Sequence, residues 1–163
     1  MVQPLFRASE ILDMAIRIEH QGLAFYQACV AADLGFRVEK VLKYLIEQEK
    51  RHISIFSQMK KGLRHFSLPE SYAGEMGAYM EAFVKEKVFV EPREASKEVA
   101  ELKDPFQAIR WAISFERRSI AFYAAMKQIV RASEKKIIDQ VIDEERTHIQ
   151  RLDELGKTLK SEA

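Results

Sequence analysis

Glu49-Lys50-Arg51-His52 and Glu145-Arg146-Thr147-His148 are two copies of one short pattern, a glutamate followed three residues later by a histidine. An earlier stretch accompanies each copy, and in both stretches, Glu19–Tyr26 and Glu116–Tyr123, a glutamate precedes a tyrosine by seven residues. The two glutamates of a half are 30 positions apart in the first half and 29 positions apart in the second. The second half of the chain therefore repeats the first, which indicates that one structural unit occurs twice.

The size and charge of the chain favour a single globular domain over residues 1–163. Of its 163 residues, 47% are hydrophobic and 31% are charged, which is enough apolar material for a core. The net charge is +1, with 26 basic and 25 acidic residues interleaved, so no basic stripe favours nucleic acid as a partner. No apolar run approaches the ~18–20 residues that a membrane span needs.

The N-terminus and the cysteine content favour the cytoplasm. Residues 1–7 lack the charged and apolar regions of a signal peptide. Cys29 is the single cysteine, which excludes a disulfide within the chain and any all-cysteine metal site in it.

Apolar residues recur with helical spacing in four segments, which predict helices over residues 9–32, 37–63, 104–131 and 133–160. Ser9 and Ser133 are candidate N-caps for the first and fourth of these helices. Asp104-Pro105 is a strong start for the third, because aspartate suits the N-cap and proline the first helical position.

The segment between the second and third helices interrupts this pattern. Pro69, Gly74, Gly77 and Pro92 punctuate it, and a short amphipathic helix is predicted over residues 75–89. Some 40 residues are more than a tight turn needs and are enough to cross the length of a bundle. We therefore expect an all-α four-helix bundle in which helices two and three run parallel.

Each of the four repeated glutamates lies in the middle of an apolar helix face. Apolar residues stand four positions before and four positions after each of them: Ala15, Leu23, Leu45, Ile53, Ala112, Ile120, Val141 and Ile149. On the first helix, Asp13, Arg17 and Gln21 are predicted to face outward. An unpaired carboxylate in an apolar stripe is costly, so these glutamates need a partner.

A pair of metal ions would supply that partner. A glutamate and a histidine three residues apart on a helix point at one object. One glutamate from each of two helices, with one Glu-x-x-His from each of the other two, is the ligand set of di-iron and di-manganese carboxylate bundles. The ligands predicted here are Glu19, Glu49, His52, Glu116, Glu145 and His148. Four carboxylates also balance the charge of two divalent ions, and the ligand types suit iron or manganese, with zinc as an alternative.

Two further features bear on this site. Glu144 lies four residues before His148 and competes with Glu145 as a ligand, but its counterpart in the other half is Gln48, which favours Glu145. Tyr26 and Tyr123 lie two turns beyond Glu19 and Glu116 on the same faces. Their phenols either orient ligand carboxylates of neighbouring helices or are core aromatics with a hydroxyl at a polar rim.

Together these residues resemble the rubrerythrin branch of the ferritin-like superfamily over nearly the whole chain. The resemblance implies a ferritin-like bundle with a bridged di-iron centre that reacts with hydrogen peroxide or oxygen. It further implies that Glu49 and Glu145 bridge the metals, that Glu19 and Glu116 are terminal ligands, and that one histidine caps each metal.

The chain departs from that family pattern in two ways. Full-length rubrerythrins carry a rubredoxin-like domain with paired Cys-x-x-Cys motifs, which one cysteine cannot supply, so we expect electrons from a separate rubredoxin-like donor. Many rubrerythrins also have an extra glutamate where this chain has Ser119, whose repeat partner is Gly22. These two small residues either leave an opening beside the metals or let the helices pack closely.

The functional hypothesis is a non-haem di-iron oxidoreductase that reduces hydrogen peroxide or oxygen to water. Its alternatives are a ferroxidase or iron-binding protein, an oxidase of an organic substrate, and a structural bundle. A homodimer is expected as well, with candidate contact residues Phe6, Tyr44, Phe66 and Trp111.

Overall fold

The computed structural model describes residues 8–63, 97, 99–102, 104–128 and 130–163. Within these ranges the protein is helical without any strand, and its long helices are α1 (Ala8–Ala31), α2 (Phe36–Gly62), α5 (Pro105–Met126) and α6 (Ala132–Glu162). The sequence therefore predicted the all-α bundle correctly. The helix predicted over 75–89 lies outside the described residues.

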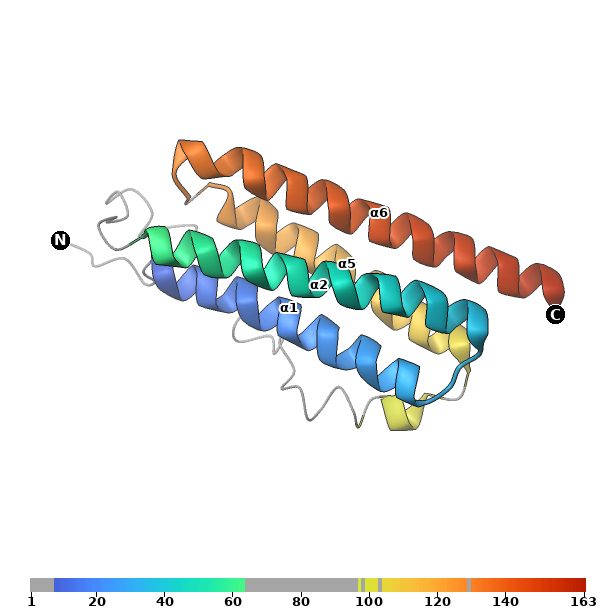
Figure 1. The fold of residues 1–163 in the computed structure, drawn as a ribbon. Coiled ribbons are helices and arrows are strands. Elements are labelled where there is room, and N and C mark those ends of the chain that lie inside the picture. The colour runs from blue at the N-terminus through green and yellow to red at the C-terminus, as the bar shows by residue number, and fades with distance from the viewer. Residues whose placement is uncertain (1–7, 64–96, 98, 103, 129) are drawn as a thin grey trace.

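The four helices form two antiparallel hairpins, α1 with α2 and α5 with α6 (Figure 1). Helix α2 also contacts α6, and α1 contacts α5, so the hairpins pack side by side along their length. Helices α2 and α5 run in the same direction in Figure 1, as the long connection between them predicted. This topology brings the two sequence repeats face to face.

The helix ends follow local chemistry, and two of them differ from the sequence prediction. Asp104 caps α5 as expected, since its carboxylate accepts a hydrogen bond of 2.9 Å from the backbone N–H of Gln107. Ser133 does not cap α6, because the N-cap residue is Arg131 and the side chain of Glu134 accepts from its backbone N–H. Ser9 likewise lies inside α1 rather than at its N-cap.

Helix α5 ends at Met126, whereas the sequence predicted that it continues to residue 131. The backbone N–H groups of Gln128 and Val130 bond to Ala125 and Met126 in a short turn. The turn reverses the chain so that α6 can start at Ala132. This connection contains no glycine or proline, so no residue of the sequence indicated a turn there.

The apolar core lies in two clusters along the bundle. The first contains buried residues such as Leu12, Phe56, Phe122 and Ile138. The second contains Phe25, Leu45, Ala112 and Leu152, among others. In each helix the repeated glutamate lies between a residue of one cluster and a residue of the other, so a polar layer divides an otherwise apolar interior.

The flanks of the helices bury residues that the sequence placed on the outside. Gln21 is 2% exposed although it was predicted to face outward, because it shares a flank of α1 with Phe25, one turn further along. Phe25 stacks on Trp111 of α5 with 3.5 Å between ring centroids. Trp111 therefore takes part in intramolecular packing, and Tyr44 lies against His148. Phe6 and Phe66 lie outside the described residues.

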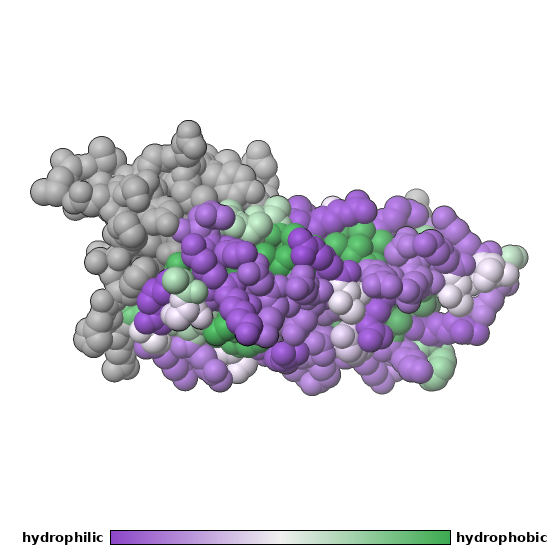
Figure 2. All heavy atoms as spheres, turned by 90° about the horizontal axis from the view of Figure 1, so that it is seen from above, coloured by the Kyte–Doolittle hydropathy of each residue, from purple (hydrophilic) through white to green (hydrophobic). Residues whose placement is uncertain are grey.

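Polar side chains dominate the face of the bundle seen in Figure 2, with apolar patches between them. Arg17 and His20 of α1 are exposed, as their places on the helix indicate. No helix in the described part of the chain is long and apolar enough to cross a membrane.

Candidate metal centre

The six residues predicted as metal ligands lie at one level of the bundle, and all of them are 0–1% exposed. Helix α1 contributes Glu19, α2 contributes Glu49 and His52, α5 contributes Glu116, and α6 contributes Glu145 and His148. Equivalent positions of the two repeats meet because each hairpin presents the same face to the other. Burial of four carboxylates together requires compensating positive charge.

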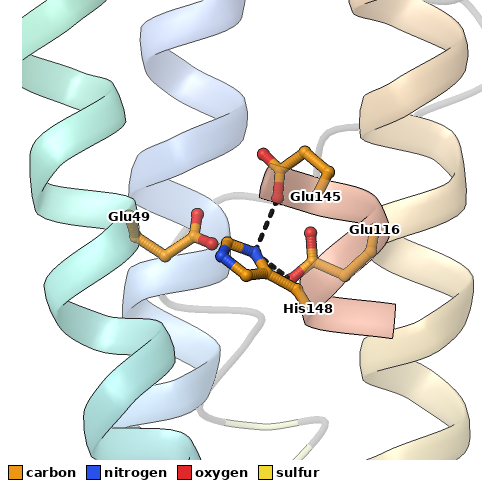
Figure 3. A group of neighbouring side chains, drawn as sticks. All are labelled: Glu49, Glu116, Glu145 and His148. Atoms are coloured by element: carbon orange, nitrogen blue, oxygen red, sulfur yellow. Dashed lines mark ion pairs between the residues drawn. The ribbon is translucent and has the colours of Figure 1, made fainter. Parts of the chain in front are cut away.

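These residues form two groups, each with ligand atoms that lie within 4.8 Å of one another. The first group is Glu49, Glu116, Glu145 and His148, whose side chains point toward one another from α2, α5 and α6 (Figure 3). The second group is Glu19, Glu49 and His52. Glu49 belongs to both groups, so one carboxylate links the two candidate ion positions.

Glu145 also reaches both positions, because its two oxygens face different histidines. Its Oε1 is 3.2 Å from Nδ1 of His52, and its Oε2 is 2.7 Å from Nδ1 of His148. The same two nitrogens lie 3.2 Å from Glu19 Oε2 and 3.5 Å from Glu116 Oε1, respectively. Each histidine thus turns Nδ1 toward the carboxylates in the centre of the bundle.

The two tyrosines cross between the halves of the molecule. The hydroxyl of Tyr26 in the first half donates a hydrogen bond of 2.5 Å to Oε1 of Glu116 in the second half. The hydroxyl of Tyr123 in the second half donates to Oε1 of Glu19 in the first half. Burial, and next the charge of the carboxylate that each one faces, raise the pKa of both phenols well above 10, so both remain donors at neutral pH.

The carboxylates and imidazoles of the layer perturb one another strongly. Burial, and then the charge of Glu19, raise the pKa of Glu49 well above its ordinary value. Burial and Glu145 raise the pKa of Glu116 to about 8. Burial opposes protonation of the histidines, but the facing carboxylates outweigh it and raise the pKa of His52 to about 12 and of His148 to about 10. The metal-free layer therefore retains protons at neutral pH.

Glu145 behaves differently from the other carboxylates. Burial alone would raise its pKa, but hydrogen bonds and charge from His148 and His52 outweigh burial and lower the pKa far below the ordinary range. Glu145 therefore stays ionised between two imidazolium groups when metal is absent.

Several buried polar atoms of the layer have no hydrogen-bond partner in the structure. They are Oε1 and Oε2 of Glu49, Oε2 of Glu116 and Nε2 of His148, whereas Nδ1 of His148 and Oε2 of Glu145 meet only each other, as an ion pair of 2.7 Å. Buried acceptors without a donor are costly, and a cation satisfies carboxylate oxygens and an imidazole nitrogen together. The donor set therefore fits a pair of divalent ions, and its mixed oxygen and nitrogen character suits iron, manganese or zinc.

Glu144 takes a position that sequence reasoning did not anticipate. Considered only as a competitor of Glu145, it turns instead to the other half, where its Oε2 is 2.8 Å from Nε2 of His52. Its Oε1 is 3.0 Å from the guanidinium of Arg51. The partnership joins residues 92 positions apart, so no local spacing could have revealed it.

Gly22 and Ser119 leave no opening beside the layer. A Cβ atom at Gly22 would lie 2.7 Å from a ring carbon of Phe115 and 2.8 Å from Oε2 of Glu49, so the site of a side chain is already filled. Ser119 is buried, and its hydroxyl donates to the carbonyl of Phe115 one turn earlier. Of the two alternatives for these small residues, the structure has close packing.

A surface groove of about 660 Å³ lies between the first half of α2 and the last half of α6. Its lining includes Phe36, Lys40 and Tyr44 from α2 and Arg151 and Leu155 from α6. The ring of Tyr44 meets the ring of His148 edge-on at 6.1 Å between centroids, and the Arg151 guanidinium lies 4.2 Å above the Tyr44 ring. The Tyr44 side chain thus lies between the groove and His148 of the buried layer.

A four-helix bundle with a long crossover and a buried layer of repeated glutamates and histidines is the class of ferritin-like carboxylate proteins. Comparison with family models makes the family specific: the Rubrerythrin model matches residues 10–156, so the chain belongs to the rubrerythrin family. Comparisons with curated proteins and with solved structures gave no match.

Proposed function

We propose that this protein is a di-iron oxidoreductase that reduces hydrogen peroxide or oxygen to water with electrons from a separate protein. The observation that carries the proposal is the pair of buried carboxylate–histidine groups that share Glu49, within a member of the rubrerythrin family. When bound there, two ferrous ions would supply the two electrons that, together with two protons from solvent, convert one hydrogen peroxide to two waters.

The contacts of each ligand support its proposed role. Glu49 and Glu145 would bridge the ions, because Glu49 belongs to both groups and Glu145 faces both histidines. Glu19 and Glu116 would be terminal ligands, since each faces one histidine and accepts from one tyrosine. The histidines would cap one ion each through Nδ1.

Tyr26 and Tyr123 would orient the terminal carboxylates. Each hydroxyl occupies one oxygen of its glutamate, Oε1; the other oxygen of Glu19 faces His52, and the other oxygen of Glu116 is buried without a hydrogen-bond partner. Aromatic side chains pack beside the layer, with the Phe56 ring centroid 5.0 Å from that of Tyr123 and Phe115 against Gly22. This packing would exclude bulk water and keep the electrostatic interactions of the site strong.

The test compares iron in the protein with iron in solution. Reduced protein loaded anaerobically with about two irons per chain is mixed with one equivalent of hydrogen peroxide, and its visible and near-ultraviolet spectrum is followed. We expect oxidation much faster than that of free ferrous ion at the same concentration. Oxidation at the rate of free ferrous ion, or a protein purified with zinc and inert after iron loading, would contradict the oxidoreductase.

The groove beside Tyr44 is our proposed entry for electrons, with an acidic donor protein as its occupant. Three cations, Arg37, Lys40 and Arg151, line the groove with one acid, Glu154; Arg37 also pairs with Glu162 at 2.6 Å, and Tyr44 connects the groove to His148. Charges of this kind steer association of an oppositely charged partner. Reduced rubredoxin is the probe that we would use.

Lys40→Glu should slow reduction of the oxidised, iron-loaded protein by rubredoxin several-fold, and added salt should slow the wild type. Lys136→Glu makes the same charge change on an exposed residue near the opposite end of the bundle and serves as the matched control. Equal slowing of reduction by the two variants would contradict the groove as the entry point for electrons and would leave the proposed metal centre unaffected.

A further inference from the structure

The two histidines of the metal centre have different surroundings on their outer sides. Nδ1 of His52 faces Glu19 and Glu145 in the interior, and Nε2 faces Glu144, 2.8 Å away. The second oxygen of Glu144 lies 3.0 Å from Arg51, so the carboxylate is itself held in place between α2 and α6. A carboxylate accepts but does not donate, so Glu144 holds a proton on Nε2, and loss of the Nδ1 proton would then leave the Nδ1 lone pair for a metal.

The repeat-related position offers no such partner to His148. The residue that corresponds to Glu144 is Gln48, and the residue that corresponds to Arg51 is Thr147. The hydroxyl of Thr147 donates to the carbonyl of Asp143 within its own helix. Nε2 of His148 is buried without a hydrogen-bond partner, and the ring lies beside the edge of Tyr44.

We infer that Glu144 is a positioning residue for His52 and makes the two metal positions unequal, with the higher affinity at the position capped by His52. The inference rests on the proposed di-metal site and concerns a residue that does not touch the metals. An acidic partner on the outer nitrogen raises the basicity of the ligating nitrogen and holds the ring in its ligating orientation. His148 lacks both effects.

Loss of such a partner typically lowers metal affinity ~10–100-fold. Glu144→Ala should therefore weaken binding at one position by about that factor and leave the other unchanged. Glu144→Gln keeps an acceptor oxygen without the charge, so it should retain the His52 orientation and give an intermediate affinity. Asp143→Ala is the matched control, since Asp143 is the adjacent acid, and its side chain is 71% exposed and pairs with Arg146 on its own helix.

The experiment titrates metal-free protein anaerobically with Co(II), followed by its visible absorption, for wild type and the three variants. In parallel, the histidine side-chain N–H resonances of the zinc-loaded proteins are recorded by NMR. We expect two binding steps in wild type, one weakened step in Glu144→Ala, and one slowly exchanging histidine N–H that Glu144→Ala loses and Glu144→Gln retains.

The outcomes separate this inference from the proposed site. A wild type that binds no Co(II) with circular dichroism showing a folded bundle would refute the di-metal site itself. Binding of two ions with the same affinities in wild type and Glu144→Ala would overturn the role of Glu144 and leave the site standing. Equal weakening by Asp143→Ala would also overturn it, because the effect would then come from the net charge of α6.

Discussion

The α1–α2 hairpin and the α5–α6 hairpin carry the same ligand pattern but support it differently. In both hairpins the tyrosine reaches across and donates to the glutamate of the other half. In the first, Glu144 from α6 and Arg51 hold the outer side of His52, whereas His148 in the second has an aromatic neighbour and an unsatisfied nitrogen. The sequence repeat therefore sets which glutamates and histidines enter the buried layer, while the neighbours of these residues make the two halves of the layer different.

The small residues of the two hairpins also differ in what they permit. Gly22 lets Phe115 and the Glu49 carboxylate occupy the space beside α1, whereas Ser119 has a side chain that bonds within its own helix. Phe115 of the second half therefore comes directly against α1 at Gly22. Four predictions use these differences, from the largest expected effect to the smallest.

Replacement of the shared carboxylate should affect both metal positions. Glu49→Gln should reduce the metal content from about two ions per chain to fewer than one, because both groups lose a ligand, whereas Glu19→Gln should lose only one ion. The metal-free Glu49→Gln protein should keep more of its stability at high pH than metal-free wild type, because the amide has no carboxyl proton to lose as the pH rises. Metal analysis and thermal unfolding with a chelator measure both effects. Equal metal loss in the two variants would contradict a shared Glu49.

Metal-free protein should lose stability as the pH rises, and metal should reverse the trend. The pKa values of Glu49 and Glu116 are higher in the folded protein than the ordinary value of 4.5. Their protonated forms therefore contribute stability fully below pH 4.5, and the contribution of Glu116 is lost as the pH rises through about 8. The protonated forms of His52 and His148 contribute stability fully below pH 6.5, and these contributions are lost as the pH rises through about 12 for His52 and about 10 for His148. Glu145 acts in the opposite sense, since its lowered pKa adds stability above 4.5 that disappears in acid.

We therefore expect the Tm of the metal-free protein to be highest at about pH 5–6 and to fall toward about pH 9. Metal requires deprotonated ligands, so the stabilisation that it gives should grow over the same range. Thermal unfolding followed by circular dichroism, with chelator and with Zn(II), measures both curves. A flat curve without metal would contradict the protonated layer.

Gly22→Ala tests the close approach on the α1 side. Alanine ordinarily favours a helix over glycine by ~1 kcal/mol, yet here its Cβ would meet Phe115 and Glu49, so we expect a net loss of ~1–3 kcal/mol. Ser119→Ala, at the equivalent position of the other half, removes only a hydroxyl bonded within its helix and should change stability by less than ~1 kcal/mol. Urea unfolding compares them, and a stabilised Gly22→Ala would show that the space is open.

Replacement of Tyr26 and replacement of Tyr123, which hydrogen-bond across the two halves, should have similar effects on stability and metal binding. Tyr26→Phe and Tyr123→Phe each remove one donor to a buried carboxylate, at a cost of ~1–3 kcal/mol of affinity or stability. Each variant should also weaken metal binding at the position whose glutamate it orients. Co(II) titration of both variants provides the measurement. A large effect of one with none of the other would show that the two halves differ in this feature as well.

Most of the candidate site could be predicted from sequence because the spacing of its residues along each helix is local. Glutamate and histidine three residues apart share a helix face whatever the tertiary structure, and the apolar residues four positions away identify that face as the buried one. The Asp104-Pro105 start of α5 was predicted for the same reason, since a cap depends on its next few residues.

Contacts between helices were beyond such reasoning. Gln21 was predicted to face solvent and is buried, because a helix in a bundle covers its flanks as well as its central stripe. Trp111, predicted as an outward contact residue, is partly exposed, and sequence reasoning did not anticipate that it also stacks between Phe25 and Phe115. Helix α5 ends at Met126, before the predicted end at residue 131, and the chain then turns into α6 at Ala132.

The sequence by itself determined the helices, the repeat and the six side chains of the buried layer, since these follow from helical periodicity and from the cost of an unpaired carboxylate in an apolar stripe. The tertiary structure alone decided that Tyr26 and Tyr123 cross between the halves, that Gly22 accommodates Glu49, and that Glu144 contacts His52 and Arg51. Those contacts join residues far apart in the chain, and the packing of one hairpin against the other sets their geometry.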